Sequence, residues 1–319
     1  MKSSRALTWI VLVSSMTAGG LCHAGDPPLW DAARQPRLVR DVRALREAER
    51  AFLQARVVGG PGALLLMQEA ERILERADAA SSPDPRARFF YGRLLGHAGK
   101  DERAAKTLRD AIALAPNHPS VGEAMFALAV SLARLGRTQE EIAAYDAWLK
   151  REPSREQRAI GLSNQAEAFM VAGRLEDAVR AYRLAVDLAH DNALAHWGLA
   201  VALDRSGDPA GAIHEAGVAL TYDPDAKELN GPNVFFVPPR DRFWYRALGA
   251  MARANSASDV GMRALWWDRA TLLWQQYLDA SPIDDRWVPI ARIRHAFCEQ
   301  ATRDAQLRAR SRRAPSVRP

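Results

Sequence analysis

YGRLLGHAGKDERAAKTLRDAIALAP, residues 91–116, is the stretch that decides the fold. It contains two apolar stripes at helical spacing, joined by a short turn at Gly99. The second stripe carries small residues, Ala104 and Ala111, and Pro116 closes it. The pattern recurs three times in the chain, as LAVSLARLGRTQEEIAAYDAWLKREP (128–153), QAEAFMVAGRLEDAVRAYRLAVDLAH (165–190) and LAVALDRSGDPAGAIHEAGVALTYDP (199–224).

The turn glycines of the four segments are regularly spaced. Gly99, Gly136, Gly173 and Gly207 lie 37, 37 and 34 residues apart. A glycine at the end of a helix can take the left-handed conformation that reverses the chain. Small residues in the following helix let the two backbones approach closely, and proline ends the unit because it cannot continue a helix. Each segment therefore predicts a pair of antiparallel helices.

These residues resemble the tetratricopeptide repeat (TPR) family, whose unit of about 34 residues is a helix-turn-helix pair. The resemblance covers residues 85–225 as four repeats. The second repeat departs from it, with Glu141 and Trp148 where small residues are expected, and His190 replaces the closing proline of the third. We interpret Trp148 as filling space between neighbouring repeats. The resemblance implies an all-α fold, a right-handed α-solenoid of TPR-like antiparallel helix pairs.

The segments on either side of the four repeats fit the same scheme less closely. Residues 25–84 contain two amphipathic stretches around the turn VVGGPG, which predict a degenerate N-terminal helix pair. Residues 240–302 predict a further TPR-like helix pair and a C-terminal capping helix, because the end of a solenoid needs an altered outer face. Residues 303–319 are rich in arginine and poor in apolar residues, so we expect a basic disordered tail.

An extended apolar insert is expected at residues 226–239, between the fourth repeat and the C-terminal pair. Residues 229–239 read LNGPNVFFVPP, and the glycine and three prolines break a helix. The four consecutive apolar residues at 234–237 need cover from other parts of the protein. We expect Phe235 and Phe236 to lie across the helices, either filling part of the binding groove or fastening the C-terminal helices.

The first 24 residues have the layout of a secretory signal peptide, with Lys2 and Arg5, an apolar core and Ala24 before the cleavage point. Cleavage after Ala24 predicts an exported, periplasmic protein. An uncleaved segment that tethers the chain to the membrane is the alternative, since the apolar stretch approaches the length of a span. Lipidation of Cys22 is a third alternative, but residues 19–21 are in the wrong order for a lipobox.

The net charge of +6 belongs to the two ends of the chain. The predicted signal peptide carries +2 and residues 303–319 carry +5, which leaves −1 for the rest. Nucleic acid is therefore not expected as a partner. The Arg-rich tail could contact acidic lipids or an acidic partner, and a solvated tail is the alternative. Arginine far outnumbers lysine, which together with the export signal suggests a bacterial envelope protein.

Catalytic and metal-binding motifs are not recognisable. His214 and Glu215 lack the second histidine of a zinc protease motif. His295 and Cys298 lie on one helical face, but without further ligands they are more simply residues of a packed helix. We expect no enzyme activity, no metal and no small-molecule cofactor.

The resemblance implies a concave groove, formed by the first helix of each repeat, that holds a peptide or helix of a partner. Phenylalanines stand where one variant of the family has its carboxylate-binding residues, so we expect an apolar groove edged by arginine. Aromatic and arginine side chains are common anchors of partner binding. As the alternative, these aromatics pack between repeats or are covered by a segment of the protein itself. His97 and Ser163 also fall at inner positions, and the predicted groove residues are Phe89, Arg93, Phe126, Val130, Arg134, Glu167, Met170, Trp197, Val201 and Arg205.

The sequence thus predicts a non-catalytic protein–protein interaction scaffold in the bacterial cell envelope, with one or more envelope proteins as partners. A glycan-binding or enzyme-accessory protein is the alternative, because five tryptophans gather in the C-terminal part and aromatic faces suit sugars. Tryptophans at helical spacing are also typical of a core. The five are Trp244, Trp266, Trp267, Trp274 and Trp287.

Overall fold

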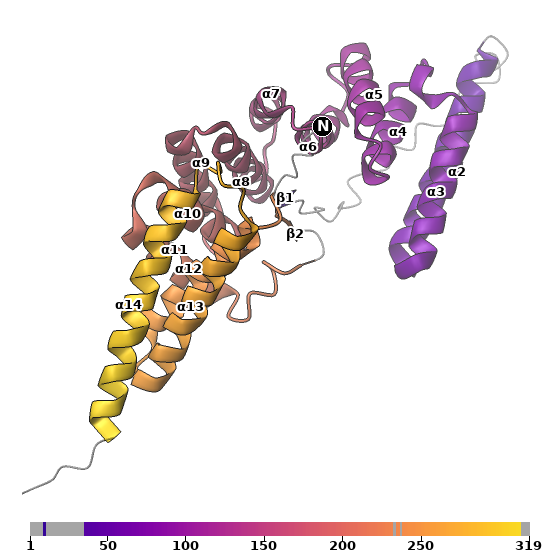
Figure 1. Cartoon of the computed structure of the whole chain (residues 1–319). Helices are drawn as coiled ribbons and strands as arrows, with labels where there is room; N and C mark the ends of the chain where they lie inside the picture. Colours follow the sequence, from indigo (N-terminus) through magenta and orange to yellow (C-terminus); the bar gives the residue numbers. More distant parts are fainter. Residues whose placement is uncertain (1–8, 11–34, 232–233, 237, 314–319) are drawn as a thin grey trace, which may run out of the picture. The chain divides into compact units, whose positions relative to one another are not determined.

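The computed structural model describes residues 9–10, 35–231, 234–236 and 238–313 (Figure 1). The predicted signal peptide, apart from Trp9–Ile10, and its cleavage point lie outside the described residues. The chain divides between Glu152 and Pro153 into two compact units. We call them the N-terminal unit, which contains the helices before this point, and the C-terminal unit, which contains those after it together with residues 9–10.

Each unit consists of stacked antiparallel helix pairs, which confirms the predicted all-α architecture. The N-terminal unit contains α2 (Pro36–Val58), α3 (Gly60–Arg76), the short 3-10 helix η1 (Ala79–Ser81), α4 (Pro85–His97), α5 (Asp101–Leu114), α6 (Val121–Arg134) and α7 (Thr138–Leu149). The C-terminal unit contains α8 (Arg155–Ala172), α9 (Leu175–Leu188), α10 (Ala193–Ser206), α11 (Pro209–Tyr222), α12 (Asp241–Ser256), α13 (Val260–Ala280) and α14 (Val288–Arg313). Within each unit the first helices of successive pairs contact one another and form one layer.

The turn glycines and the small residues of the repeats have the conformation and burial that the sequence predicts. The four turn glycines have φ between +69° and +95°, a conformation that other residues adopt only with strain. Ala104 and Ala111 are completely buried, as are the alanines at the same offsets in the third and fourth repeats. In the second repeat Trp148 is buried, and its ring lies 5.0 Å from that of Phe126 on α6. Trp148 therefore fills the space that a small residue leaves elsewhere.

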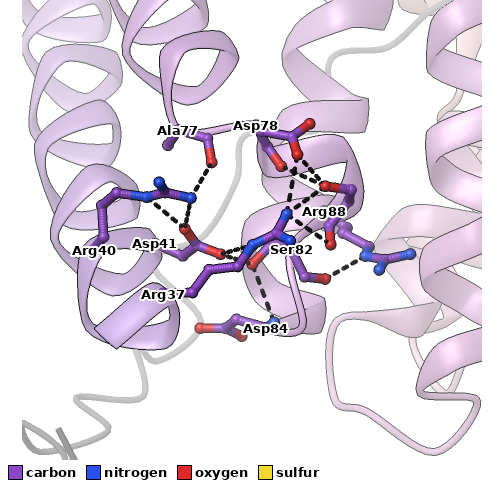
Figure 2. A network of polar contacts seen from close by, with 9 residues as sticks. Arg37, Arg40, Asp41, Ala77, Asp78, Ser82, Asp84 and Arg88 are labelled. Atoms are coloured by element: carbon purple, nitrogen blue, oxygen red, sulfur yellow. Dashed lines mark hydrogen bonds and ion pairs between the residues drawn. The ribbon is translucent and has the colours of Figure 1, made fainter. Parts of the chain in front are cut away.

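The N-terminal helix pair is fastened to the first repeat by a polar network (Figure 2). The Ser82 hydroxyl donates a hydrogen bond of 2.6 Å to the Asp41 carboxylate of α2, and both residues are buried. Asp84, the N-cap of α4, donates its backbone N–H to the same hydroxyl. Arg40 of α2 reaches the carbonyl oxygen of Ala77 at 3.3 Å. These contacts fix the start of α2 against η1 and α4.

The insert after α11 forms a short strand, β2 (Val234–Phe235), that pairs antiparallel with β1 (Trp9–Ile10). The ring of Phe236 packs edge-on against the ring of Tyr245 on α12, with 5.3 Å between their centres. The Phe235 side chain lies outside the described residues. Leu229 is buried, and the Asn230 side chain accepts a hydrogen bond from Arg246 of α12. The insert thus fastens to the C-terminal helices, which is one of the two roles expected of it.

The last helix is longer than expected. Residues 303–319 were predicted as a disordered tail, but α14 continues to Arg313, and residues 314–319 lie outside the described part of the chain. The reason is a buried stripe that extends past the predicted boundary, through Thr302 and Ala305. Among the described residues, no helix is long and apolar enough to cross a membrane.

Candidate partner-binding site

The inner layer of the N-terminal unit is formed by α4 and α6, and the structure divides its predicted groove residues into two groups. Phe89 and Val130 are buried and belong to the core. Arg93, Phe126 and Arg134 are partly exposed. Phe126 packs against the rings of Tyr145 and Trp148, and part of its surface is exposed to solvent.

Charged side chains surround the open part of this layer. Arg93 forms an ion pair with Glu123, which links α4 to α6. Arg134 donates a hydrogen bond of 2.6 Å to the carbonyl oxygen of Gly96 and lies 3.4 Å from the Asp101 carboxylate. His97, at the end of α4, is exposed to solvent along part of its surface. The surrounding protein and the positive charges of Arg93 and Arg134 lower its pKa to about 4, so the imidazole is neutral at pH 7.

The inner layer of the C-terminal unit is not an open groove, contrary to the expectation from sequence. Glu167, Met170, Trp197, Val201 and Arg205 are all buried, and Ser163 is buried with them. They form a packed interior between the layer of α8, α10 and α12 and residues 285–298, which follow later in the chain. A partner could reach these side chains only if residues 285–298 moved away from the layer.

The segment that covers this layer comes from the C-terminal end of the chain, and we call residues 285–298 the strap. Arg286 donates hydrogen bonds to the carbonyl oxygens of Met170 and Val171 at the end of α8, at 2.9 and 3.2 Å. Arg294 pairs with Asp204 of α10, with 2.7 Å between Nε and Oδ1. The covered groove is therefore the alternative that the sequence left open.

Arg205 is the centre of the covered layer. Its guanidinium lies 2.9 Å from the Asp241 carboxylate and between two indole rings, those of Trp244 at 4.7 Å and of the strap residue Trp287 at 4.9 Å. Burial would disfavour the charge, but the Asp241 carboxylate keeps the pKa of Arg205 above its usual value. Trp287 of the strap thus packs against the Arg205 guanidinium, which the sequence analysis expected to face a partner.

A second buried group lies nearby at Glu167. Its Oε1 accepts hydrogen bonds from the hydroxyls of Tyr182 on α9 and Tyr245 on α12, the latter at 2.9 Å. Burial raises the pKa of Glu167 to about 7, although both tyrosine hydrogen bonds oppose the increase. Three helices therefore meet at one carboxyl group that the sequence analysis had placed in the groove.

Comparison with known proteins concerns the repeats that carry this layer. A family model described as "Tetratricopeptide repeat" matches residues 67–119, 113–156 and 163–226. The chain is a TPR protein. No curated protein matched the chain.

Solved TPR structures share the fold at low sequence identity. A structure titled "MamA 41-end from Desulfovibrio magneticus RS-1" has a TM-score of 0.50 and 18% identity, covering 58% of this chain and 96% of the other. The "MamA RS-1 ArsTM double mutant" gives a TM-score of 0.50 and 18% identity over 58% of this chain and 95% of the other. A structure titled "Crystal structure of YrrB: a TPR protein with an unusual peptide-binding site" has a TM-score of 0.45 and 14% identity, covering 59% and 94%. The likeness to the first two structures concerns the fold alone.

The tryptophans of the C-terminal part belong mainly to the interior of this TPR protein. Trp244, Trp267 and Trp274 are buried, and the rings of Trp244 and Trp274 meet edge-on at 4.9 Å. Trp266 is partly exposed, with the Arg253 guanidinium 4.9 Å from its ring. Because Trp244, Trp267 and Trp274 are buried among other rings, these three do not present the open aromatic platform that the glycan-binding alternative needs.

Metal and thiol chemistry have little support in the part of the chain that is described. No group of three or more His, Cys, Asp or Glu side chains in this part is arranged to hold a metal ion. Cys298 is buried on α14, and burial raises the pKa of its thiol to about 12. A thiol that stays protonated is a poor nucleophile and ligand.

Proposed function

We propose that this TPR protein is a non-catalytic scaffold of the bacterial cell envelope that holds a peptide or helix of another envelope protein. Stacked TPR helix pairs form extended surfaces that bind other proteins, and membership of this family supports that general role. The partner is held on the inner layer of the N-terminal unit. The observation that carries this choice is the difference in exposure between α4 and α6 on one side and α8 and α10 on the other.

The chemistry of the open layer suits a partner segment with an apolar residue beside a carboxylate. Phe126 offers a partly exposed aromatic side chain on α6, and Arg93 of α4 and Arg134 of α6 offer partly exposed guanidinium groups on the same layer. Both arginines already contact carboxylates of the chain, so a partner's carboxylate would exchange for one of these or join it. The exchange retains a charged hydrogen bond and therefore adds specificity more than affinity.

The proposal includes export, with cleavage after Ala24 and therefore loss of β1 (Trp9–Ile10) from the mature protein, and it includes neither nucleic acid nor a cofactor. The support is the layout of the first 24 residues and the location of the positive charge at the chain ends. Fractionation of cells followed by mass spectrometry of the N-terminus tests it. A protein recovered with Met1 intact from the cytoplasm would contradict it.

The binding site is tested by placing a photo-crosslinking amino acid at His97 and, as a matched control, at Lys106. His97 is exposed at the inner layer, whereas Lys106 is exposed on the second helix α5. We expect a specific envelope protein to be crosslinked from position 97 alone. The Phe126→Ala and Arg93→Ala variants should each weaken that crosslink while the circular dichroism spectrum stays helical.

The opposite results would contradict the proposal. Equal crosslinking from both positions would mean that α4 and α6 do not form the site. A crosslink that survives both substitutions would mean that Phe126 and Arg93 are not part of it. Trp197 is unsuitable for such a test, because it is buried and its replacement would first disturb the core.

A further inference from the structure

The solvent-facing side of α14 carries a largely exposed apolar stripe, in which the ring of Phe297 also packs edge-on against that of Trp267 on α13. Ile293, Phe297 and Leu307 are 62%, 53% and 62% exposed. Separations of four and ten residues place all three on one side of a helix. The opposite side, which includes Val288, Ala291, Cys298, Thr302 and Ala305, is the buried one. In Figure 1 α14 runs beside α13 along its length, and the two helices contact each other.

Arginines lie along both edges of this stripe. Arg292, Arg303 and Arg310 share one edge by their spacing of eleven and seven residues, and Arg308 lies near the other. All four are exposed. Asp304 is the acidic residue within the stripe, and residues 303–319 together carry +5. The helix face therefore has apolar residues along its centre, interrupted by Gln300 and Asp304, and arginines along its borders, with Glu299 among them on one side.

We propose that this face of α14 docks in the plane of a lipid bilayer that contains anionic headgroups. A helix at such an interface buries apolar side chains at the level of the acyl chains and directs arginines toward the phosphates. The stripe of Ile293, Phe297 and Leu307 supplies the first requirement, and the arginine borders supply the second. Nucleic acid would use the arginines but would leave the apolar stripe exposed, so the combination favours a membrane.

The inference is independent of the proposed function, because it uses a different unit of the chain. If both hold, α14 sets the scaffold against a membrane surface while α4 and α6 hold the partner. The crosslink from position 97 and the binding of α14 to lipid are measured separately, so failure of one leaves the other intact.

Flotation with lipid vesicles tests the inference on the full protein as it accumulates in cells. One set of vesicles contains phosphatidylcholine alone and the other contains phosphatidylcholine with phosphatidylglycerol. We expect binding to the second set that weakens strongly as salt is added, because the Debye length falls. No binding to the anionic vesicles would overturn the inference.

Two triple variants distinguish the effect of the α14 arginines on vesicle binding from the effect of the protein's net charge. Arg292→Glu, Arg303→Glu and Arg310→Glu together should weaken vesicle binding by about 100-fold or more, which corresponds to about fivefold per arginine removed. Arg43→Glu, Arg50→Glu and Arg76→Glu change the net charge equally, at exposed positions of the N-terminal helix pair. They should change binding only a few-fold. Equal losses in the two triples would show a general electrostatic effect and overturn the inference.

The apolar stripe is tested by Ile293→Ser with Leu307→Ser, both at exposed positions where folding is not at risk. Vesicle binding should fall about tenfold or more, because the stripe no longer inserts. Unchanged binding would overturn the inference. If the unmodified protein instead forms a dimer in sedimentation velocity that this variant loses, and vesicles are not bound, the face is an interface between copies and the inference fails.

Discussion

Removing the strap residue Arg294 should destabilise the C-terminal unit through the carboxylate that it leaves behind. Asp204 is completely buried, and Arg294 Nε lies 2.7 Å from its Oδ1. Arg294→Met retains most of the side-chain stem and removes the charge. Breaking a buried ion pair from one side typically costs about 3–5 kcal/mol, because the remaining charge is unpaired. We expect a loss of about 3 kcal/mol at pH 7.

The pH dependence of this loss follows from the pKa of Asp204. Burial already raises that pKa, and the charge and hydrogen bond of Arg294 oppose the increase. Without Arg294 the pKa rises further, so the folded variant binds a proton more readily than the unfolded chain does. The stability deficit of the variant should therefore shrink as the pH is lowered from 7 toward the pKa of aspartate in the unfolded chain, about 3.9.

Guanidinium unfolding followed by tryptophan fluorescence measures the effect, since six tryptophans lie between residues 153 and 313. The control Arg292→Met, at an exposed position on the same helix, should cost less than about 0.5 kcal/mol. In an Asp204→Asn background, Arg294→Met should cost less than about 1 kcal/mol. A loss of the same size in that background would refute the reasoning, because the cost would not come from the buried carboxylate.

Three further predictions concern the same unit. Glu167 has a pKa of about 7 in the folded protein against 4.5 in the unfolded chain, so its contribution to stability is lost as the pH rises through about 7. The free energy of unfolding, measured with guanidinium, should therefore fall by up to about 3 kcal/mol between pH 5 and pH 8. The Glu167→Gln variant should lack this fall. Desolvation opposes protonation of His196, but hydrogen bonds to a carboxylate of α11 and to a backbone carbonyl raise its pKa above 6.5. Protonated His196 therefore stabilises the folded protein below pH 6.5, and this stabilisation is lost as the pH rises above the pKa in the folded protein. If urea unfolding of a His196→Gln variant shows the same decrease in stability with pH, His196 is not its cause. Gly173→Ala adds a Cβ atom 2.9 Å from Arg286 Nη1 at a residue with positive φ, whereas Gly207→Ala causes only the backbone strain of about 1 kcal/mol. Gly173→Ala should therefore lower the melting temperature more than Gly207→Ala does. Equal decreases would mean that the Arg286 side chain moves aside freely.

The repeats could be predicted from sequence because their signals are local. A glycine with positive φ and buried alanines at fixed offsets are set by contacts within one helix pair. Even the exception at Trp148 followed from its position, since a large residue in a small residue's place must occupy a neighbouring gap. Physical rules that act over one turn or one helix pair are readable without the rest of the chain.

The state of the groove could not be predicted in the same way. The contacts that cover α8 and α10 join Arg286 to Met170 and Arg294 to Asp204, residues 116 and 90 positions apart. Neither arginine differs in its local pattern from the exposed arginines around it. The length of α14 was missed for a related reason, because its arginines suggested disorder while the buried stripe through Ala305 depended on α13.

The strap has a consequence for how such a protein changes over generations. Inner positions of α8 and α10 have become interior, so substitutions there must preserve volume and polarity whatever the protein binds. Inner positions of α4 and α6 face no such constraint where they are exposed, and they can follow a changing partner. The same helix position in successive repeats is thus subject to two different kinds of selection, and recognition can diverge in one half of the chain while the other half preserves the fold.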